Sequence, residues 1–486
     1  MTGSVPLRRL VAAFLIVVAA AIQPAPSRAE AAGVPADVAL ITAAGFAEGD
    51  VGYLVVDLAD DTIVASHNPD ELFLPASVAK IPALSAALAI LGGDHRFVTT
   101  LDASGELKDG VLTGTLVLTG GGNPFLSSDE LQALAKGLAA TGVRQVDGAF
   151  LYDTSALVDV PLINAMQPEA AGYNPGVSAL SLNFNRVRVD WTRGKAAASA
   201  AASAVSEKLT LPVESIGLAF AEEALSGPFV RAGPPEEDRW LLSPTLGEKG
   251  EAWLPLGDPA LVTAEVFRTL AAAEGIALPA PAPGIAPADA RELARNVSPP
   301  LEEIASGVLR YSNNLSAELI GLAASRELTG RKLSLTDSAT ALAAWWQLRV
   351  PDADWTGLFL ENHSGLSSRS RVTPRQLVTM LEEAADQLGD TDFHDLLRPI
   401  SWKGVKGSAR VKTGTMSYAR GLAGYIDTAT GRRLAFAIFF NDTEKREALD
   451  ARFDPSVREI DPESRPWRDR ALKLEETLTS GWAGDN

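Results

Sequence analysis

Apolar runs of strand length lie near both ends of the chain. Residues 52–58 and 62–66 are mostly apolar, and the polar Ala59-Asp60-Asp61 between them predicts a β-hairpin. Three more strands are predicted near the C-terminus, at 409–412, 421–426 and 434–440. Two strands from one end and three from the other favour one antiparallel sheet built from both chain ends, with the middle of the chain as an insertion.

Helical spacing of apolar residues marks the segments between these strands. Within residues 77–91 the apolar side chains recur at helical spacing, and Gly92-Gly93 is expected to end this helix. Ser128 is the expected cap of a helix over 129–140, and Ser298 with Pro299 is expected to open a helix that reaches residue 310. Further helices are predicted at 258–275, 315–326 and 467–478, the last packing on the sheet through Leu472, Leu474 and Leu478.

The middle of the chain mixes strand and helix patterns. Residues 111–119 predict a strand pair that turns near Gly114, and strands are predicted at 146–151 and 180–191. An Ala/Ser-rich run at 195–204 suggests a small nested unit, and the proline-rich 279–287 suggests a semi-rigid linker. We therefore expect a main domain from 30–98 and 296–486, an inserted domain from 99–192 and 246–295, and a nested subdomain at 193–245.

The first 29 residues have the pattern of a secretory signal peptide. Arg8 and Arg9 precede an apolar run at 10–22, and small residues at Ser27 and Ala29 predict cleavage after Ala29. The run is too short to span about 30 Å of hydrocarbon at about 1.5 Å per residue. We expect an exported protein with no stable membrane anchor, periplasmic in a Gram-negative cell.

Composition excludes several kinds of chemistry. The 486 residues include no cysteine, so thiol catalysis and disulfides are ruled out. The four histidines lie far apart with no i,i+4 pair, which argues against a zinc-hydrolase helix. The net charge of −18, which becomes −21 once the three signal-peptide arginines are removed, argues against nucleic acid as a partner. No metal and no cofactor are expected.

Ser77 and Lys80 form a Ser-x-x-Lys pair at the start of a predicted helix. One helical turn separates them, so the hydroxyl and the amine lie on one face within hydrogen-bond reach. A lysine that burial keeps neutral can take the proton of the serine and activate it as a nucleophile. The pair alone is a weak signal, because a chain of this length contains about one such match by chance. An ordinary surface serine and lysine remain the alternative.

Two further motifs follow in a meaningful order. Ser312-Asn313-Asn314 lies between two predicted helices and can present a hydroxyl and a carboxamide, although a simple helix cap is the alternative. Lys412-Thr413-Gly414-Thr415 ends a predicted strand and can bind a carboxylate close to the backbone, although a polar strand end is the alternative. All three motifs together match the set of penicillin-binding proteins and class A β-lactamases, with Asn313 where that set has Asp.

The chain resembles the class C low-molecular-mass penicillin-binding proteins, the D-Ala-D-Ala carboxypeptidase/endopeptidase family. The wide gap between Ser77 and Ser312 distinguishes it from compact β-lactamases. Four other stretches are similar to that family: 121–124, 178–185, 364–367 and 422–426. The resemblance implies an α+β fold, in which a transpeptidase domain with a five-stranded antiparallel sheet flanked by helices carries a large inserted α/β region.

The resemblance also implies the catalytic roles. Ser77 would be the acylated nucleophile, Lys80 its proton acceptor and Ser312 the hydroxyl that relays a proton to the leaving amine. The expected activity is serine-type D-Ala-D-Ala carboxypeptidase/endopeptidase cleavage of peptidoglycan peptides ending in D-Ala-D-Ala, with acylation by β-lactam antibiotics.

The same resemblance assigns the substrate contacts. Asn314 would hydrogen-bond the acyl-side amide, Lys412 would supply positive potential and Thr413 would bind the terminal carboxylate. The backbone N–H groups of Ser77 and Thr415 would form the oxyanion hole, a kind of site worth about 3–4 kcal/mol per donor in serine proteases.

The chain departs from the family pattern around Ser-Gly-Leu-Ser. Asn362 and His363 precede it where the family often has Asp-Gly, and Ser368 follows where it often has Arg, so Arg369 or Arg371 would have to substitute. These departures bear on contacts to the substrate peptide more than on acyl chemistry.

Two other functions remain alternatives. A serine β-lactamase needs an efficient deacylating base, and no Glu-x-x-Leu-Asn segment supplies one. A cell-wall binding protein with weak or no activity would not need the intact motif residues. The sequence leaves open the balance of carboxypeptidase and endopeptidase activity, the role of the insertion and the oligomeric state.

Overall fold

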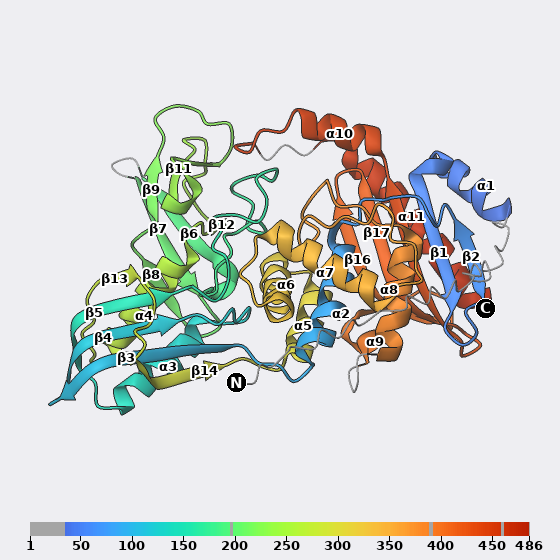
Figure 1. Cartoon of the computed structure of the whole chain (residues 1–486). Coiled ribbons are helices and arrows are strands. Elements are labelled where there is room, and N and C mark those ends of the chain that lie inside the picture. Colours follow the sequence, from blue (N-terminus) through green and yellow to red (C-terminus); the bar gives the residue numbers. More distant parts are fainter. Residues whose placement is uncertain (1–34, 195–197, 388–391, 458–460, 486) are drawn as a thin grey trace, which may run out of the picture.

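The computed structural model describes residues 35–194, 198–387, 392–457 and 461–485. Elements from the two ends of the chain lie together in one part of the molecule, and residues 98–297 form the elements of the other part (Figure 1). The predicted signal peptide, residues 1–29, lies outside the described residues. No helix among the described residues is long and apolar enough to cross a membrane.

Strands from both chain ends form one antiparallel sheet. Its strands are β1 (Val51–Asp57), β2 (Ile63–His67), β15 (Arg398–Ser401), β16 (Ser408–Met416), β17 (Ala419–Asp427) and β18 (Arg433–Asn441). They follow the order β15-β16-β17-β18-β1-β2, so β1 pairs with β18 and joins the two ends as predicted. The sheet has six strands where five were predicted, because the short edge strand β15 is mostly exposed and lacks an apolar pattern.

Helices cover both faces of this sheet. One face carries α2 (Lys80–Leu91), α5 (Leu301–Tyr311), α6 (Asn314–Thr329), α7 (Leu335–Arg349), α8 (Pro374–Gln387) and α9 (Phe393–Leu396). The other face carries α1 (Pro35–Ala43) and α11 (Ser464–Asp485), and α10 (Thr443–Ala451) follows β18. Because both faces are covered, β17 and β18 are apolar almost throughout. Leu474 and Leu478 pack on the sheet as predicted, but Leu472 is 37% exposed.

The other part of the molecule contains three sheets. The five-stranded sheet consists of β3 (Val98–Lys108), β4 (Val111–Thr119), β5 (Gln145–Asp153), β13 (Pro281–Pro283) and β14 (Arg291–Val297). The four-stranded sheet consists of β6 (Arg186–Arg193), β7 (Ala198–Val205), β8 (Thr210–Val213) and β12 (Lys249–Pro255). The small sheet consists of β9 (Gly217–Phe220), β10 (Phe229–Arg231) and β11 (Arg239–Leu242).

One apolar core joins these sheets to α3 (Ser128–Ala140) and α4 (Pro259–Ala273). The four-stranded sheet combines β6 and β12, from the predicted inserted domain, with β7 and β8, from the predicted nested subdomain at 193–245. The division into an inserted domain and a nested subdomain stays a prediction. Four short 3₁₀ helices complete the described elements: η1 (Glu48–Asp50), η2 (Ala76–Ala79), η3 (Asn183–Asn185) and η4 (Pro235–Glu237).

The predicted strand pair at 111–119 is wrong. These residues form one strand, β4, and the turn to its partner β3 lies at Asp109-Gly110. Gly114 instead faces Gly105 across the pair, where a Cβ on Gly114 would lie 2.1 Å from the carbonyl oxygen of Ser104. A glycine inside a strand can therefore mark a close backbone approach rather than a turn.

Several element boundaries also differ from the prediction. Ser127, not Ser128, caps α3 by accepting a hydrogen bond from the Glu130 backbone. Pro300, not Ser298, is the N-cap of α5, because the hydroxyl of Ser298 is used to link the chain back to residue 97. The predicted linker at 279–287 contains β13, which pairs with β5, and the predicted strand at 180–191 begins only at residue 186.

Candidate active site

Three segments that lie far apart in the sequence meet at one cavity of about 650 Å³. The cavity is lined by these residues of the predicted site: Ser77, Ser312, Asn314 and Thr415. Lys80 and Lys412 lie beneath its surface, 0% and 1% exposed, while Thr413 is half-buried and does not line the cavity. The predicted convergence of the three motifs is therefore present in the fold.

Ser77 sits in the tight turn η2, just before α2. The preceding residue, Ala76, has a left-handed φ of 46°, a conformation that costs a non-glycine residue about 1–3 kcal/mol. Two glycine backbones hold this turn from outside: a Cβ on Gly365 would lie 1.8 Å from the carbonyl oxygen of Ala76, and a Cβ on Gly414 would lie 3.1 Å from the backbone nitrogen of Ser77. The serine is thus fixed between the 365 loop and β16.

The Lys80 amine contacts three oxygen atoms. Its Nζ lies 3.0 Å from Ser77 Oγ and donates to Asn314 Oδ1 at 2.8 Å and to the carbonyl oxygen of Ser364 at 2.7 Å. A neutral amine has two N–H donors and one lone pair. The two acceptors use both donors, so the lone pair is left for the hydroxyl proton of Ser77. The geometry suits a lysine that receives a proton from the serine.

The surroundings of Lys80 favour this neutral form. Burial and the charge of Lys412 hold the pKa of Lys80 well below its ordinary value, while the carboxylate of Glu318 opposes that shift. Glu318 is fully buried on α6 and accepts hydrogen bonds from the backbone N–H groups of His363 at 3.1 Å and Ser364 at 2.9 Å. Glu318 therefore fixes the same loop whose carbonyl oxygen holds Lys80.

Ser312 and Lys412 form a second hydroxyl–amine pair across the cavity. Ser312 ends α5 with a left-handed φ of 61°, and Lys412 Nζ donates to its Oγ at 2.9 Å and to the carbonyl oxygen of Thr413 at 2.6 Å. Burial, followed by the charges of Arg420 and Arg398, lowers the pKa of Lys412 to about 7. This lysine can carry a proton at neutral pH, in contrast to Lys80.

The end of β16 has an open edge beside the serine. Strand β15 pairs only with residues 408–411, so residues 412–416 have no strand on that side within the described part of the chain. The Thr415 hydroxyl is exposed to the cavity and accepts a hydrogen bond from Arg420 at 2.9 Å. Arg420 in turn forms a buried ion pair with Glu475 of α11. An extended peptide can lie along this edge as an added strand.

The rest of the cavity wall was not predicted. Met166, Gln167 and Tyr173 line it from the inserted region, and Arg446 and Phe453 line it from α10 and the segment after it. None of these residues belongs to a motif, so nothing in the sequence marked them as part of the site. Glu318 did leave a signal: it is a carboxylate four residues after Asn314, next to the apolar run Leu319–Leu322 of the same helix.

The motif residues and the fold agree with the comparison to protein families. Residues 36–458 match the model of the D-Ala-D-Ala carboxypeptidase 3 (S13) family. The protein belongs to this family. A D-alanyl-D-alanine carboxypeptidase from Actinomadura sp. (strain R39) is 28% identical over 431 residues, which cover 81% of this chain and 78% of that protein.

Solved structures of another penicillin-binding protein have the same fold as this S13 family member. Penicillin-binding protein 4 from Haemophilus influenzae superposes with a TM-score of 0.74 at 20% identity, covering 92% of this chain and 99% of that one. A structure of the same Haemophilus protein with a bound β-lactam has a TM-score of 0.72 and covers 93% of this chain and 100% of that one.

The departures from the S13 pattern lie behind the site rather than in it. Asn362 and His363 are both buried, and neither lines the cavity. The His363 ring fits against Gly321 of α6, and its Nε2 lies 2.7 Å from the hydroxyl of Ser338. Asn362 accepts a hydrogen bond from the backbone of Gly365 at 2.9 Å, so both residues brace the loop.

The two arginines that follow this loop do not line the cavity either. Arg369 is exposed and pairs with Glu361 at 3.1 Å. Arg371 donates to the backbone carbonyls of Ser368 and Ser370. Both guanidinium groups are therefore engaged with the loop itself.

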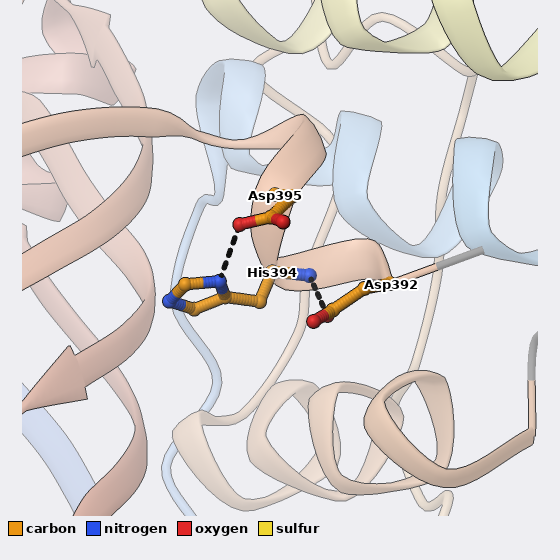
Figure 2. A group of neighbouring side chains, drawn as sticks. All are labelled: Asp392, His394 and Asp395. Atoms are coloured by element: carbon orange, nitrogen blue, oxygen red, sulfur yellow. Dashed lines mark hydrogen bonds and ion pairs between the residues drawn. The ribbon is translucent and has the colours of Figure 1, made fainter.

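One histidine–carboxylate cluster lies away from the cavity (Figure 2). His394 Nδ1 contacts Asp395 at 2.9 Å, and Asp392 accepts a hydrogen bond from the backbone of His394 as the N-cap of α9. His394 Nε2 contacts Asp427 at 3.0 Å, and Arg433 pairs with that aspartate. Because both ring nitrogens already face carboxylates, the cluster fits an ion-pair network that ties α9 to β17.

Proposed function

We propose that this protein is a serine-type D-alanyl-D-alanine carboxypeptidase/endopeptidase that cleaves peptidoglycan stem peptides through a Ser77 acyl-enzyme. The observation that carries this proposal is the fully buried Lys80 amine, 3.0 Å from Ser77 Oγ in a cavity that three distant segments line. β-Lactams would acylate the same serine, because their ring carbonyl meets the same nucleophile.

Acylation begins with the transfer of the Ser77 hydroxyl proton to Lys80. The serine oxygen attacks the carbonyl of the penultimate D-alanine, and the new oxyanion is stabilised by the backbone N–H groups of Ser77 and Thr415. The tetrahedral intermediate collapses when the C–N bond breaks. The leaving amine takes the proton of the Ser312 hydroxyl, and the proton on Lys80 passes to Ser312, so that Lys80 is neutral again before deacylation. The amine of Lys412 stabilises that hydroxyl at 2.9 Å. The departing amine is free D-alanine or, in a crosslink, the second peptide.

Deacylation completes the cycle. A water molecule loses a proton to Lys80 and attacks the acyl-enzyme carbonyl, and the shortened peptide leaves as Ser77 regains its proton. The terminal carboxylate of the substrate would lie near Lys412 and the hydroxyl groups of Thr413 and Thr415. Of these two hydroxyl groups, that of Thr415 belongs to a residue that lines the cavity.

We also propose that the protein is exported and acts in the periplasm after cleavage following Ala29. Its substrate lies outside the cytoplasm, and the pattern over residues 8–29 supports export. Sequencing the N-terminus of the protein from intact cells tests this, because the mature chain should begin at Glu30.

A fluorescent penicillin tests the proposed nucleophile. Wild-type protein should give a covalently labelled band, and Ser77→Ala should give none. Ser85→Ala is the matched control: Ser85 is a buried serine on α2 whose hydroxyl donates to the carbonyl oxygen of Ile81 within the same helix, so this variant should label normally. An unlabelled wild type, or a labelled Ser77→Ala variant, would count against the proposal.

Mass analysis of peptidoglycan digests then identifies the reaction. Release of free D-alanine indicates carboxypeptidase activity, and conversion of crosslinked fragments to monomers indicates endopeptidase activity. Rapid turnover of penicillin in place of a persistent acyl-enzyme would favour a β-lactamase instead.

A further inference from the structure

A second cavity adjoins the active-site cavity. It has a volume of about 460 Å³, and Tyr173, Ser312 and Asn314 line both cavities. Asn314 links the two walls, because its Nδ2 donates to the carbonyl oxygen of Tyr173 at 3.0 Å while its Oδ1 accepts from Lys80. Asn314, which we propose contacts the acyl-side amide, therefore lies at the boundary between the two cavities.

The cation in this cavity is Arg186, at the start of β6. Its Nε atom is buried and has no hydrogen-bond partner, and no described carboxylate forms an ion pair with its guanidinium. The guanidinium lies 5.6 Å from the centre of the Trp253 ring. A buried guanidinium nitrogen without an acceptor is costly. Protein atoms cover Nε, so an incoming carboxylate would bond to the terminal nitrogens of the guanidinium, for which the structure shows no hydrogen bond to a described residue.

The walls of this cavity are aromatic, and one of them is held in a strained conformation. Asn183, Phe184 and Asn185 all have left-handed φ values of 49°, 59° and 53°. Asparagine tolerates this conformation, but phenylalanine does not, and it costs about 1–3 kcal/mol. The two asparagines fix the turn through side-chain hydrogen bonds to Ser128 and Gly176. The turn thereby holds the Phe184 ring in the cavity wall, against Phe125 at 5.8 Å between ring centres.

We propose that this second cavity, which we name the Arg186 subsite, binds a free carboxylate on the substrate peptide, upstream of the residue whose amide contacts Asn314. The inference rests on the proposed function, because it takes Asn314 as the point where the acyl-side peptide passes from one cavity to the other. The unpartnered guanidinium selects the anionic group, and Phe184 and Phe125 give the adjoining peptide an apolar surface.

The test compares two peptides that differ only in this carboxylate. Acetyl-Glu-Ala-D-Ala-D-Ala and acetyl-Gln-Ala-D-Ala-D-Ala are titrated calorimetrically into Ser77→Ala protein, which cannot be acylated. Both peptides have the same C-terminal carboxylate, so its attraction to Lys412 cancels. The Glu peptide should bind about 10-fold to 100-fold more tightly, as expected for a hydrogen bond to a charged group.

Adding Arg186→Gln should abolish this preference, with the two peptides then binding equally. Arg188→Gln is the matched control: Arg188 lies on the same strand, pairs with Asp190 at 3.0 Å and does not line the cavity, so the preference should persist. Equal binding of both peptides to the Arg186-containing protein, or a preference that survives Arg186→Gln, would overturn the subsite.

Phe184→Gly separates binding from folding. Glycine adopts a left-handed φ freely, so relief of backbone strain should offset part of the packing lost with the ring. The variant should therefore still unfold cooperatively on heating while it binds both peptides more weakly. If Phe184→Gly binds both peptides with unchanged affinity, the aromatic wall does not contribute to peptide binding, and that part of the proposal is wrong. Penicillin labelling of the wild type reports separately on the proposed function. If the wild type is labelled but the Glu peptide binds no more tightly than the Gln peptide, only the subsite is overturned. If the Glu peptide binds more tightly but the wild type is not labelled, only the proposed function is overturned.

Discussion

The two buried lysines of the site are held by different kinds of structure. Lys80 is bound by a loop, through the carbonyl of Ser364, and the loop is fixed in turn by Glu318. Lys412 lies within β16, and regular pairing with β17 runs through it and on to residue 416. The amine of each lysine lies within 3.0 Å of a serine hydroxyl.

Their electrostatic surroundings also differ, and this difference can assign their roles. Glu318 opposes the lowering of the Lys80 pKa, but burial and Lys412 outweigh it. Burial and two arginines lower the pKa of Lys412 to about 7. The charge of Lys412 disfavours a second charge on Lys80, so Lys80 can accept a proton while Lys412 supplies positive charge.

The largest effect is expected from Lys80→Met. Removal of the proton acceptor should lower the rate constant of penicillin acylation about 10²-fold to 10⁴-fold, the usual contribution of a general base. Lys80→Arg should be about as slow, because a guanidinium stays charged and cannot accept the proton. Stopped-flow or gel-based labelling measures both variants, and rapid acylation of Lys80→Arg would remove Lys80 from the role of base.

Lys412→Met should have the next largest effect, about 10²-fold on acylation, together with a changed pH profile. Below about pH 7 Lys412 is charged and attracts the carboxylate of the β-lactam; above that pH it loses its proton, so acylation should fall with rising pH. Lys412→Met should lose this alkaline fall. It should also move the acidic limb to higher pH, because a charge that lowers the pKa of Lys80 has gone. An unchanged profile would show that Lys412 does not titrate in the reaction.

Glu318→Gln tests the loop that holds Lys80. The amide has one acceptor oxygen for two backbone N–H groups, so acylation should fall about 10-fold as the loop and Lys80 lose their fixed positions. Since Glu318 raises the pKa of Lys80, its neutralisation should lower that pKa and move the acidic limb to lower pH. A purely structural role would lower the rate without shifting the limb. Glu327→Gln, on the same helix, is the control and should leave the profile unchanged.

The sequence predicted that three separate motifs meet at one cavity, which the fold shows, while the catalytic roles of their residues stay predictions. The Ser-x-x-Lys pair, the Ser312 motif and the Lys412 strand each carry a pattern that a single segment can express. The sequence also predicted that strands from both chain ends share one antiparallel sheet, and β1 pairs with β18 in it. The order of the three motifs along the chain then made the resemblance to a known family recognisable.

The sequence could not predict what depends on tertiary contacts. Glu318 was not among the predicted site residues, because its role depends on the fold, which buries it against the backbone of residues 363 and 364. Asn362 and His363 were interpreted as residues that bear on substrate contacts, but their places behind the loop follow from the position of Gly321 on α6. Thr413 and Thr415 look alike in the motif and lie two residues apart on β16, so strand alternation does not separate them. Only the neighbouring elements decide that Thr415 lines the cavity and Thr413 does not.

The smallest effect concerns the packing behind the Lys80 loop. A Cβ on Gly321 would lie 2.2 Å from the His363 ring, so Gly321→Ala should destabilise the fold by about 1–3 kcal/mol and displace the loop that carries Ser364. His363→Gly removes the ring, and the double variant should therefore be more stable than the sum of the two single changes predicts. Gly481→Ala is the control: nothing lies within 4 Å of its added Cβ, and the change should stabilise α11 by up to about 1 kcal/mol. Thermal unfolding and acylation rates of all four variants measure this coupling. If the effects of the two changes are additive, His363 does not transmit the packing of α6 to Lys80. If they are not additive and the alkaline fall in acylation that depends on Lys412 is unchanged, the coupling acts on Lys80 and not on Lys412.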